Sequence, residues 1–445
     1  MFGGLLADGH TASFVAFRVP ATPGPLSFPA RSPPVSLSFK ALSSLRHVPG
    51  FPQFTISALL LGTAASFAVP YMPLFARNEA GMSPLLLGIF MTLMSLSGVL
   101  ISTVLARWSD RGARNKPVML AAIVSAALGY VLLCTTRSYV PLVLIASVFL
   151  GTGAAAFPQL FAFAKTHFAL AGEDLADRSM ITLRSMFSVA WMLGPAAAAV
   201  ILEVAGFTGL FLSAAACYLL VGLPLLWARS RPVARTSTPA PVTSTDDAGP
   251  KRPLTLVALS FVLFGMSNTM GFIALPLHVT GAMGEPSSTV GWLIGLCAFL
   301  EIPFILSFAL FSGRFSNERL ITLSLGLFVA YFVMMAAAPA VWMLAVAQLI
   351  RAAVIAVMTT LGMAYFQELM PNRTSTALTL YANTNSIGAV LAGVVSGAFA
   401  QAFGYQAVFV LCAAMTGAAF VLLYVVTRRP AQQPALAPSQ ASAAD

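Results

Sequence analysis

Apolar residues form long blocks along this chain, and polar residues and prolines gather between the blocks. From Phe51 onward the blocks reach about 20 residues, the length that a helix needs to cross a hydrocarbon core about 30 Å thick. The pattern predicts an all-α membrane protein. We expect twelve spans near residues 53–76, 84–106, 116–136, 140–165, 178–203, 207–228, 254–279, 288–311, 319–337, 340–367, 374–400 and 405–427.

The polar segments divide the chain into five parts. Residues 1–50 are rich in Pro, Ser and Gly and lack the apolar core of a secretory signal. We interpret them as a disordered cytoplasmic extension, or as the result of a start codon assigned too early. A proline-containing cytoplasmic linker, 229–253, separates two six-helix halves, 51–228 and 254–427. The tail 428–445 is rich in Ala, Pro and Gln, and we expect it to be disordered.

The composition excludes a water-soluble protein of this size. Only 9% of the 445 residues are charged and 58% are hydrophobic, whereas a soluble domain carries charge on roughly a quarter of its residues. The net charge of +10 does not indicate nucleic-acid binding, because the basic residues lie between apolar blocks and not on one face. They indicate orientation instead. With the N-terminus inside, 20 of the 24 basic residues are cytoplasmic and two, Arg77 and Arg137, are outside, so both termini are predicted to be cytoplasmic.

The two halves repeat one another in sequence. Three motifs recur in the same order: Gly62, Pro73 and Gly88 with Gly265, Pro276 and Gly291; residues 106–110 with 313–317; and residues 203–211 with 401–409. The offsets are 203, 207 and 198 residues. Because each half has six predicted spans, both halves begin on the same side, and we expect parallel repeats related by an axis along the membrane normal.

The loop after the second predicted span reads ARWSDRGARNK. It resembles the signature loop of the major facilitator superfamily, although Ala106 stands where that loop usually has Gly. The resemblance implies a twelve-helix bundle and a conformational role for Asp110, Arg111 and Arg114, as a cytoplasmic charge lock that opens when the transporter changes state. A merely basic loop is the alternative. In the second copy Asn317 replaces the acid, so we expect a weaker lock there.

Gly194 and Pro195 in the fifth span resemble the Gly-Pro motif of exporters in the same superfamily. Gly permits close helix contact, and Pro removes one backbone hydrogen bond and bends the helix. The resemblance implies that both residues take part in conformational gating. An ordinary helix kink explains the same residues equally well.

Four longer strings are similar to those of the bacterial sugar efflux transporter (SET) family: FPQLFA at 157–162, LEIP at 300–303, YFQELMP at 365–371 and TLYAN at 379–383. The similarity extends over roughly residues 55–427. It implies a multi-pass protein of the bacterial inner membrane that exports lactose, glucose or related glycosides in exchange for protons. A monomer is the expectation for this family.

Polar side chains inside spans mark a solute pathway or a structural contact. A sugar site needs planar hydrogen-bonding groups for the hydroxyls and an aromatic ring for the apolar face of the sugar. Arg184, Trp191 and Pro195 share one helix face by their spacing, and that face should point into the bundle. An isolated Asn or Gln could instead form a helix–helix hydrogen bond. The candidate substrate-binding residues are Gln159, Arg184, Trp191, Asn268, Arg351 and Asn383.

Glu301 is the only carboxylate near the middle of a predicted span, and proton coupling requires a carboxylate that can change its charge. A static ion pair with Arg351 is the alternative. His278 near the end of the seventh span fits a loop or gate residue better than a proton carrier.

No nucleophile–base set or Walker-type loop occurs, so an enzyme is not indicated. The four cysteines are scattered singly, and neither a metal site nor a cofactor is expected. The resemblance to the sugar efflux family favours a proton-coupled sugar exporter embedded in the lipid bilayer. A multidrug exporter of the same superfamily and a solute sensor that does not transport remain as alternatives.

Overall fold

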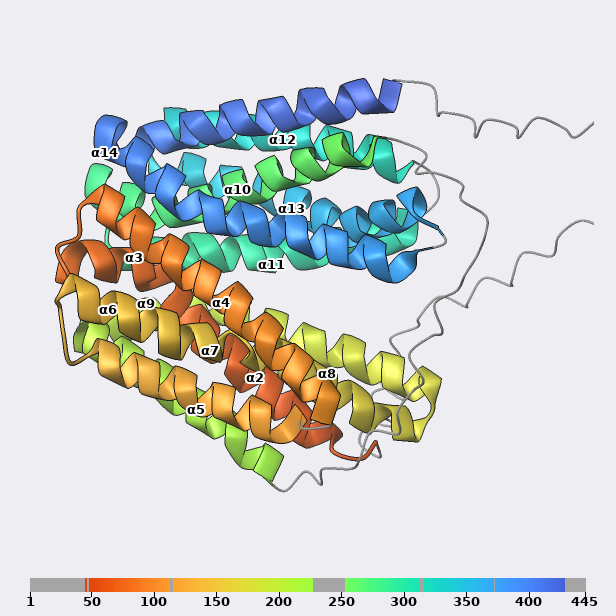
Figure 1. Cartoon of the computed structure of the whole chain (residues 1–445). Coiled ribbons are helices and arrows are strands. Elements are labelled where there is room, and N and C mark those ends of the chain that lie inside the picture. The colour runs from red at the N-terminus through yellow and green to blue at the C-terminus, as the bar shows by residue number, and fades with distance from the viewer. Residues whose placement is uncertain are drawn as a thin grey trace, which may run out of the picture. The chain divides into compact units, whose positions relative to one another are not determined.

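The computed structural model describes residues 45, 48–112, 115–226, 253–311, 316–371 and 373–428, and these form helices and short connections without strands (Figure 1). The part from Ser44 onward is one compact unit. Most of the extension 1–50, nearly all of the linker 229–253 and the tail beyond Arg428 lie outside the described residues.

The helices of the first half follow the predicted apolar blocks. They are α2 (Phe51–Ala68), which continues through α3 (Met72–Leu74), α4 (Pro84–Gly112), α5 (Asn115–Leu133), α6 (Tyr139–Ile145), α7 (Gly151–Gly153), α8 (Ala156–Phe168) and α9 (Glu173–Leu226). The second half contains α10 (Leu254–Leu277), α11 (Ser287–Phe311), α12 (Asn317–Ala337), α13 (Val341–Leu369) and α14 (Thr374–Arg428). Ten helical segments of the described chain are long and apolar enough to cross a membrane.

Two of the ten segments are helical hairpins rather than single rods. In α9, of 54 residues, Gly206 has non-helical backbone angles with φ 63°, and in α14, of 55 residues, Gly404 has φ 81°. Glycine alone adopts such positive φ angles without strain. Four contacts with α2 and its extension establish the reversal in α9. Gly62 contacts Ala190 and Tyr71 contacts Pro195, so the first arm of α9 lies parallel to α2. Ser57 contacts Val221 and Phe75 contacts Phe211, so the second arm lies antiparallel to it.

The sequence repeat is also a structural repeat. Gly206 and Gly404 are separated by the offset of 198 that relates the third pair of motifs. The first helix of each half ends in a short π-helical segment, Phe75–Glu79 or His278–Ala282. These two segments are separated by 203 residues, the offset of the first pair of motifs. Each half also packs its first helix against its last hairpin, α2 against α9 and α10 against α14.

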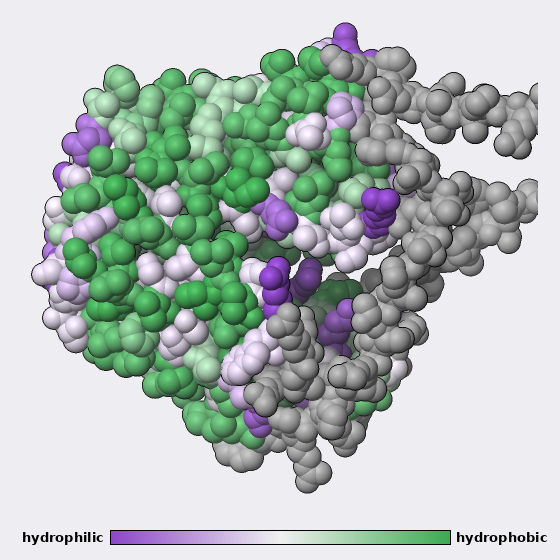
Figure 2. All heavy atoms as spheres, in the orientation of Figure 1, coloured by the Kyte–Doolittle hydropathy of each residue, from purple (hydrophilic) through white to green (hydrophobic). Residues whose placement is uncertain are grey.

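The halves meet along two helix pairs, α4 with α14 and α9 with α11. Gly88 lies against the backbone of Gly393, and Gly291 lies against the backbone of Pro195, both within the first two turns of α4 and α11. A side chain on either glycine would meet a backbone oxygen, so close helix contact depends on these small residues. Elsewhere the exterior is apolar, as Figure 2 shows for one face, which suits lipid as the surrounding solvent.

Candidate functional site

A cavity of about 290 Å³ lies between the two halves. It is lined by α9 of the first half and by α10, α11 and α13 of the second half. Its lining residues are Phe187, Ser188, Trp191, Phe272, Ile294, Cys297, Ala298, Glu301, Ile302, Ile305, Arg351 and Ile355. On the face drawn in Figure 2, the surface is hollowed between the two groups of helices, and hydrophilic residues border the hollow. A cavity that takes its walls from both halves changes shape whenever the halves move relative to one another.

Arg351 and Glu301 supply the charge of this cavity. Arg351 is only 6% exposed, and its guanidinium lies 5.6 Å from the centre of the Phe272 ring, a cation–π arrangement that favours a buried cation. Glu301 on α11 is half-buried in the same lining. No ion pair within 4.0 Å joins the two side chains. Both groups therefore line the cavity without the direct pairing that a static salt bridge would require.

Trp191 contributes an unused hydrogen-bond donor. Its indole Nε1 is buried and has no acceptor, although Trp191 itself lines the cavity. Buried polar groups are nearly always paired, so an unpaired donor on a residue that lines a cavity indicates a missing partner. Asn268 also has a buried oxygen, Oδ1, without a donor, and it lies one turn from Phe272 on α10.

The other predicted substrate residues lie outside the lining of this cavity. Arg184 is exposed on α9, one turn before Ser188 on the face that carries Trp191. Asn383 is exposed on α14. Gln159 is buried on α8, where its Oε1 accepts a 3.1 Å hydrogen bond from the Ser109 hydroxyl. The structure thus brings together Trp191, Arg351 and Glu301, and it places Gln159 in a contact between α8 and α4.

The predicted gating residues occupy two different places. Asp110 and Arg111 belong to the last turn of α4, but the positions of their side chains, and all of Arg114, are outside the described part of the chain. Gly194 and Pro195 lie at the centre of a junction between α2, α9 and α11. There the side chain of Ser66 lies directly against Gly194.

The second copy of the signature loop forms a polar contact at the start of α12. The Asn317 side chain donates a 2.6 Å hydrogen bond to Oε1 of Glu368 at the end of α13. The neutral residue therefore binds a carboxylate on a neighbouring helix of its own half.

Sequence reasoning did not identify the apolar lining of the cavity. On α11 the lining residues follow one helical face that includes Glu301, with the spacing of Ile294, Ala298, Glu301 and Ile305. This spacing was available in the sequence. However, nearly every position of a membrane span is apolar, so hydrophobicity alone does not show which face lines a cavity.

Comparison with known proteins identifies the family. The sequence profile of the Major Facilitator Superfamily matches residues 11–176, 54–256 and 257–444. The chain belongs to the major facilitator superfamily. A protein of Deinococcus radiodurans, provisionally named a sugar efflux transporter, is 45% identical over 379 residues, which cover 84% of this chain and 97% of that protein. Sugar efflux transporter A of Escherichia coli is 30% identical over 372 residues, covering 83% and 94% of the two chains.

A solved structure shows the same fold at greater evolutionary distance. The nucleoside transporter NupG superposes with a TM-score of 0.71 over 86% of this chain and all of its own, at 14% sequence identity. The predicted resemblance to the superfamily and to its bacterial sugar efflux transporters is therefore confirmed. This transporter is a multi-pass membrane protein and not an enzyme.

Proposed function

We propose that this transporter exports sugars or glycosides of the lactose and glucose class by alternating access, coupled to inward movement of protons. The observation that carries the proposal is the shared cavity, in which Trp191 of the first half faces Glu301 and Arg351 of the second. These residues provide an aromatic ring, a carboxylate and a guanidinium, which are the groups that bind a sugar and a proton. The names of the matched relatives agree with this substrate class.

The proposed architecture is twelve crossings in two parallel six-helix repeats, 51–228 and 254–427, with both termini cytoplasmic. The reversals at Gly206 and Gly404 support it, because each divides one long helix into two segments of membrane-spanning length. In this orientation the contacts of Gly88 and Gly291 lie at the outer end of the bundle. Because the halves are in close contact there, we infer that the structure corresponds to a state closed towards the outside.

In the proposed binding mode, the Trp191 ring covers the apolar face of the sugar and its N–H donates to a hydroxyl. The planar guanidinium of Arg351 donates to further hydroxyls. Asn268 provides an acceptor one turn away from Phe272. Arg184 extends the same α9 face beyond Ser188 and would contact the sugar on its way to the cavity, whereas Gln159 and Asn383 would contribute only in another conformation.

Glu301 is the proposed proton carrier. When the cavity opens to the cytoplasm, the Glu301 carboxyl releases its proton, and the sugar enters beside the ionised carboxylate and Arg351. After the halves reverse, the sugar leaves to the outside and a proton from that side binds to Glu301. Each cycle then moves one sugar out and one proton in, with Arg351 as the counter-charge. Asp110, Arg111 and Arg114 would hold the cytoplasmic end closed in the outward state, and Gly194 and Pro195 would permit the opposite end to close.

Inverted vesicles with a pH dye and an imposed acid interior test this function. Addition of lactose, glucose or a thioglycoside should release protons from vesicles that contain the wild-type chain. The Glu301→Gln variant should lose this proton release but retain exchange of labelled sugar for unlabelled sugar. Glu203→Gln, at an exposed position beside the Gly206 break, is the matched control and should behave as wild type.

Other results would replace the proposal. Proton release with lipophilic cations but with no sugar would indicate a multidrug exporter. Binding of sugar without any flux would indicate a sensor. Unchanged proton-coupled efflux in Glu301→Gln would remove Glu301 from the coupling mechanism.

A further inference from the structure

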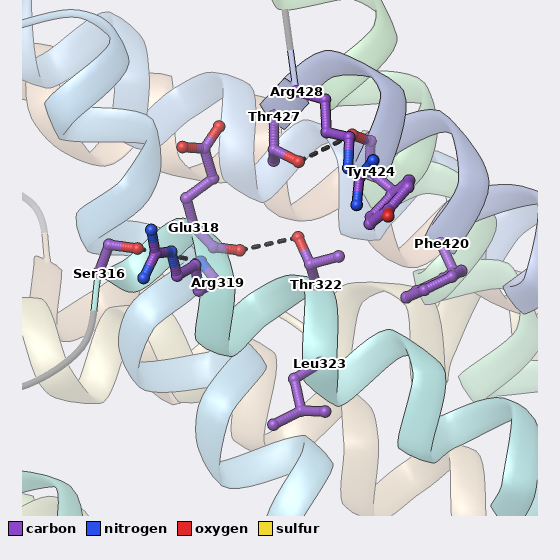
Figure 3. A pocket seen from close by; sticks show the side chains of 9 residues that line it. All are labelled: Ser316, Glu318, Arg319, Thr322, Leu323, Phe420, Tyr424, Thr427 and Arg428. Carbon is purple, nitrogen blue, oxygen red and sulfur yellow. Dashed lines mark hydrogen bonds between the residues drawn. The ribbon is translucent and has the colours of Figure 1, made fainter.

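A second and larger cavity, of about 690 Å³, lies between the start of α12 and the end of α14 (Figure 3). We call it the α12–α14 pocket. Its lining residues are Ser316, Glu318, Arg319, Thr322, Leu323, Phe420, Tyr424, Thr427 and Arg428. None of them lines the central cavity, and all belong to the second half, so the transport site does not explain this pocket.

The polar end of the pocket carries two arginines. Arg428 lies over the Tyr424 ring with its guanidinium carbon 4.5 Å from the ring centre, which orients the cation beside the pocket. Arg319 is exposed on the first turn of α12. No acidic partner within 4.0 Å is described for either guanidinium. The hydroxyls of Ser316 and Thr427 lie in the same lining, as Figure 3 shows.

One acid, Glu318, also lines the pocket. Its carboxylate accepts a 3.3 Å hydrogen bond from the Tyr365 hydroxyl of α13, so part of its hydrogen-bonding capacity is used on a neighbouring helix. With two arginines and one glutamate, the lining has a net positive charge. The Thr427 hydroxyl already donates a 2.8 Å hydrogen bond to the Tyr424 carbonyl, whereas the Ser316 oxygen accepts from the Arg319 backbone N–H. A positive pocket with two guanidinium groups suits an oxyanion such as a phosphate ester.

The opposite end of the pocket is apolar. Leu323 is 60% exposed, and Phe420 lies one turn before Tyr424 on α14. Leu323 comes four residues after Arg319 on α12, and Phe420 comes eight residues before Arg428 on α14, so both lie further into their helices than the arginines do. The pocket therefore changes from cationic to apolar along its length, which matches a lipid with a charged headgroup and a hydrocarbon chain.

We propose that the α12–α14 pocket binds an anionic phospholipid, with the phosphate held by Arg319 and Arg428 and an acyl chain along Leu323 and Phe420. In the topology proposed above the pocket lies at the cytoplasmic leaflet, where anionic lipids attract basic residues close to a membrane span. The bound lipid would connect the start of α12 to the end of α14 and stabilise this side of the second half. The site requires neither sugar transport nor Glu301, so its test is independent of the transport function.

Native mass spectrometry of the purified full chain tests the proposal, with phosphatidylglycerol and phosphatidylcholine of identical acyl chains as probes. The wild type should retain phosphatidylglycerol in preference to phosphatidylcholine. The double variant Arg319→Gln/Arg428→Gln should lower phosphatidylglycerol affinity about tenfold or more, because two charge-assisted contacts to the phosphate are lost. Arg178→Gln, which removes an exposed arginine at the same membrane side but outside the pocket, is the matched control and should retain wild-type affinity.

Two further measurements separate phospholipid binding from a loss of stability and from binding of a soluble phosphate compound. Thermal unfolding in phosphatidylcholine alone should be the same for the double variant and the wild type, and if the double variant unfolds early, the single variant Arg428→Gln replaces it. Inorganic phosphate and glycerol phosphate should not displace the lipid at millimolar concentration. Equal phosphatidylglycerol binding in the variant would overturn the proposal, and full displacement by inorganic phosphate would assign the pocket to a soluble phosphate compound instead.

Discussion

The Tyr71 hydroxyl donates a 2.7 Å hydrogen bond to the backbone carbonyl of Pro195. This bond connects the end of the first helix of one half to the first arm of α9. The other half touches both at this point, because Gly291 lies against the Pro195 carbonyl and the Tyr71 hydroxyl. The corresponding contact at the second interface joins Gly88 to Gly393. Closure of this end of the bundle therefore depends on the absence of side chains at two repeat-related glycines.

Replacing Gly291 with alanine should prevent this closure. The added methyl group would meet a backbone oxygen that cannot rotate away, so α9 and α11 must separate, at a cost of about 1–3 kcal/mol in the closed state. We expect active sugar efflux to fall at least tenfold with unchanged membrane insertion. Gly281→Ala is the control, because nothing lies within 4 Å of a methyl group there. Equal efflux in both variants would contradict the close-contact interpretation.

Trp191→Phe should weaken sugar binding while leaving the aromatic surface in place. The substitution removes only the indole N–H and part of the ring, and one hydrogen bond contributes roughly 0.5–1.5 kcal/mol, a factor of about 2–12 in affinity. Equilibrium binding of a labelled glycoside to the purified protein measures the change. Trp292→Phe, at an exposed tryptophan outside the cavity lining, should bind as wild type does.

Arg351→Lys should separate sugar binding from charge compensation. Lysine retains the positive charge opposite Glu301 but cannot present the planar donor pair of a guanidinium. We expect weaker sugar affinity, by about tenfold, with proton release per transported sugar unchanged. Labelled sugar flux and dye response recorded on the same vesicles give this ratio. A lower ratio in the variant would mean that the guanidinium also takes part in proton transfer.

His278→Phe should stabilise the protein. His278 is 3% exposed, both of its ring nitrogens are buried without partners, and its ring lies 5.4 Å from that of Phe409. The repeat-related residue of the first half is Phe75, whose ring lies 4.8 Å from that of Phe211. Phenylalanine removes the unpaired nitrogens and retains the aromatic contact, so thermal unfolding should show a gain of about 1–3 kcal/mol.

The reciprocal variant Phe75→His serves as the comparison for His278→Phe and should be destabilised, because it introduces unpaired nitrogens into an apolar contact. If His278→Phe is more stable but transports sugar poorly, His278 acts in gating. Destabilisation of His278→Phe would show that the nitrogens have partners in the membrane.

The proposed orientation predicts opposite labelling of two serine-to-cysteine variants. Ser138 lies in the connection between α5 and α6, and Ser375 in the first turn of α14, and both are exposed. In intact cells a membrane-impermeant maleimide should label Ser138→Cys, whereas Ser375→Cys should react only after the cells are opened. Labelling of the wild-type chain measures the background reaction of its four native cysteines. The reverse pattern would place both termini outside.

The sequence by itself determined the elements and their repetition. A bilayer requires apolar helices of defined length, so the blocks predicted the helices, and the predicted gaps at 203–207 and 400–405 contain the breaks at Gly206 and Gly404. Motifs in the same order at nearly equal offsets also revealed the repeat, because two halves with the same fold keep nearly the same spacing along the chain.

Only the tertiary structure decided which polar residues share a cavity. Helical periodicity assigns Trp191 to a face of its own helix, but it does not show that Arg351, 160 positions later, lies opposite that face. Gln159 had the same chemical character and yet binds Ser109, within its own half. The physical reason is that helix pairing in lipid depends on close backbone contacts at small residues such as Gly88 and Gly393, and these contacts, not hydrophobicity, orient each polar side chain.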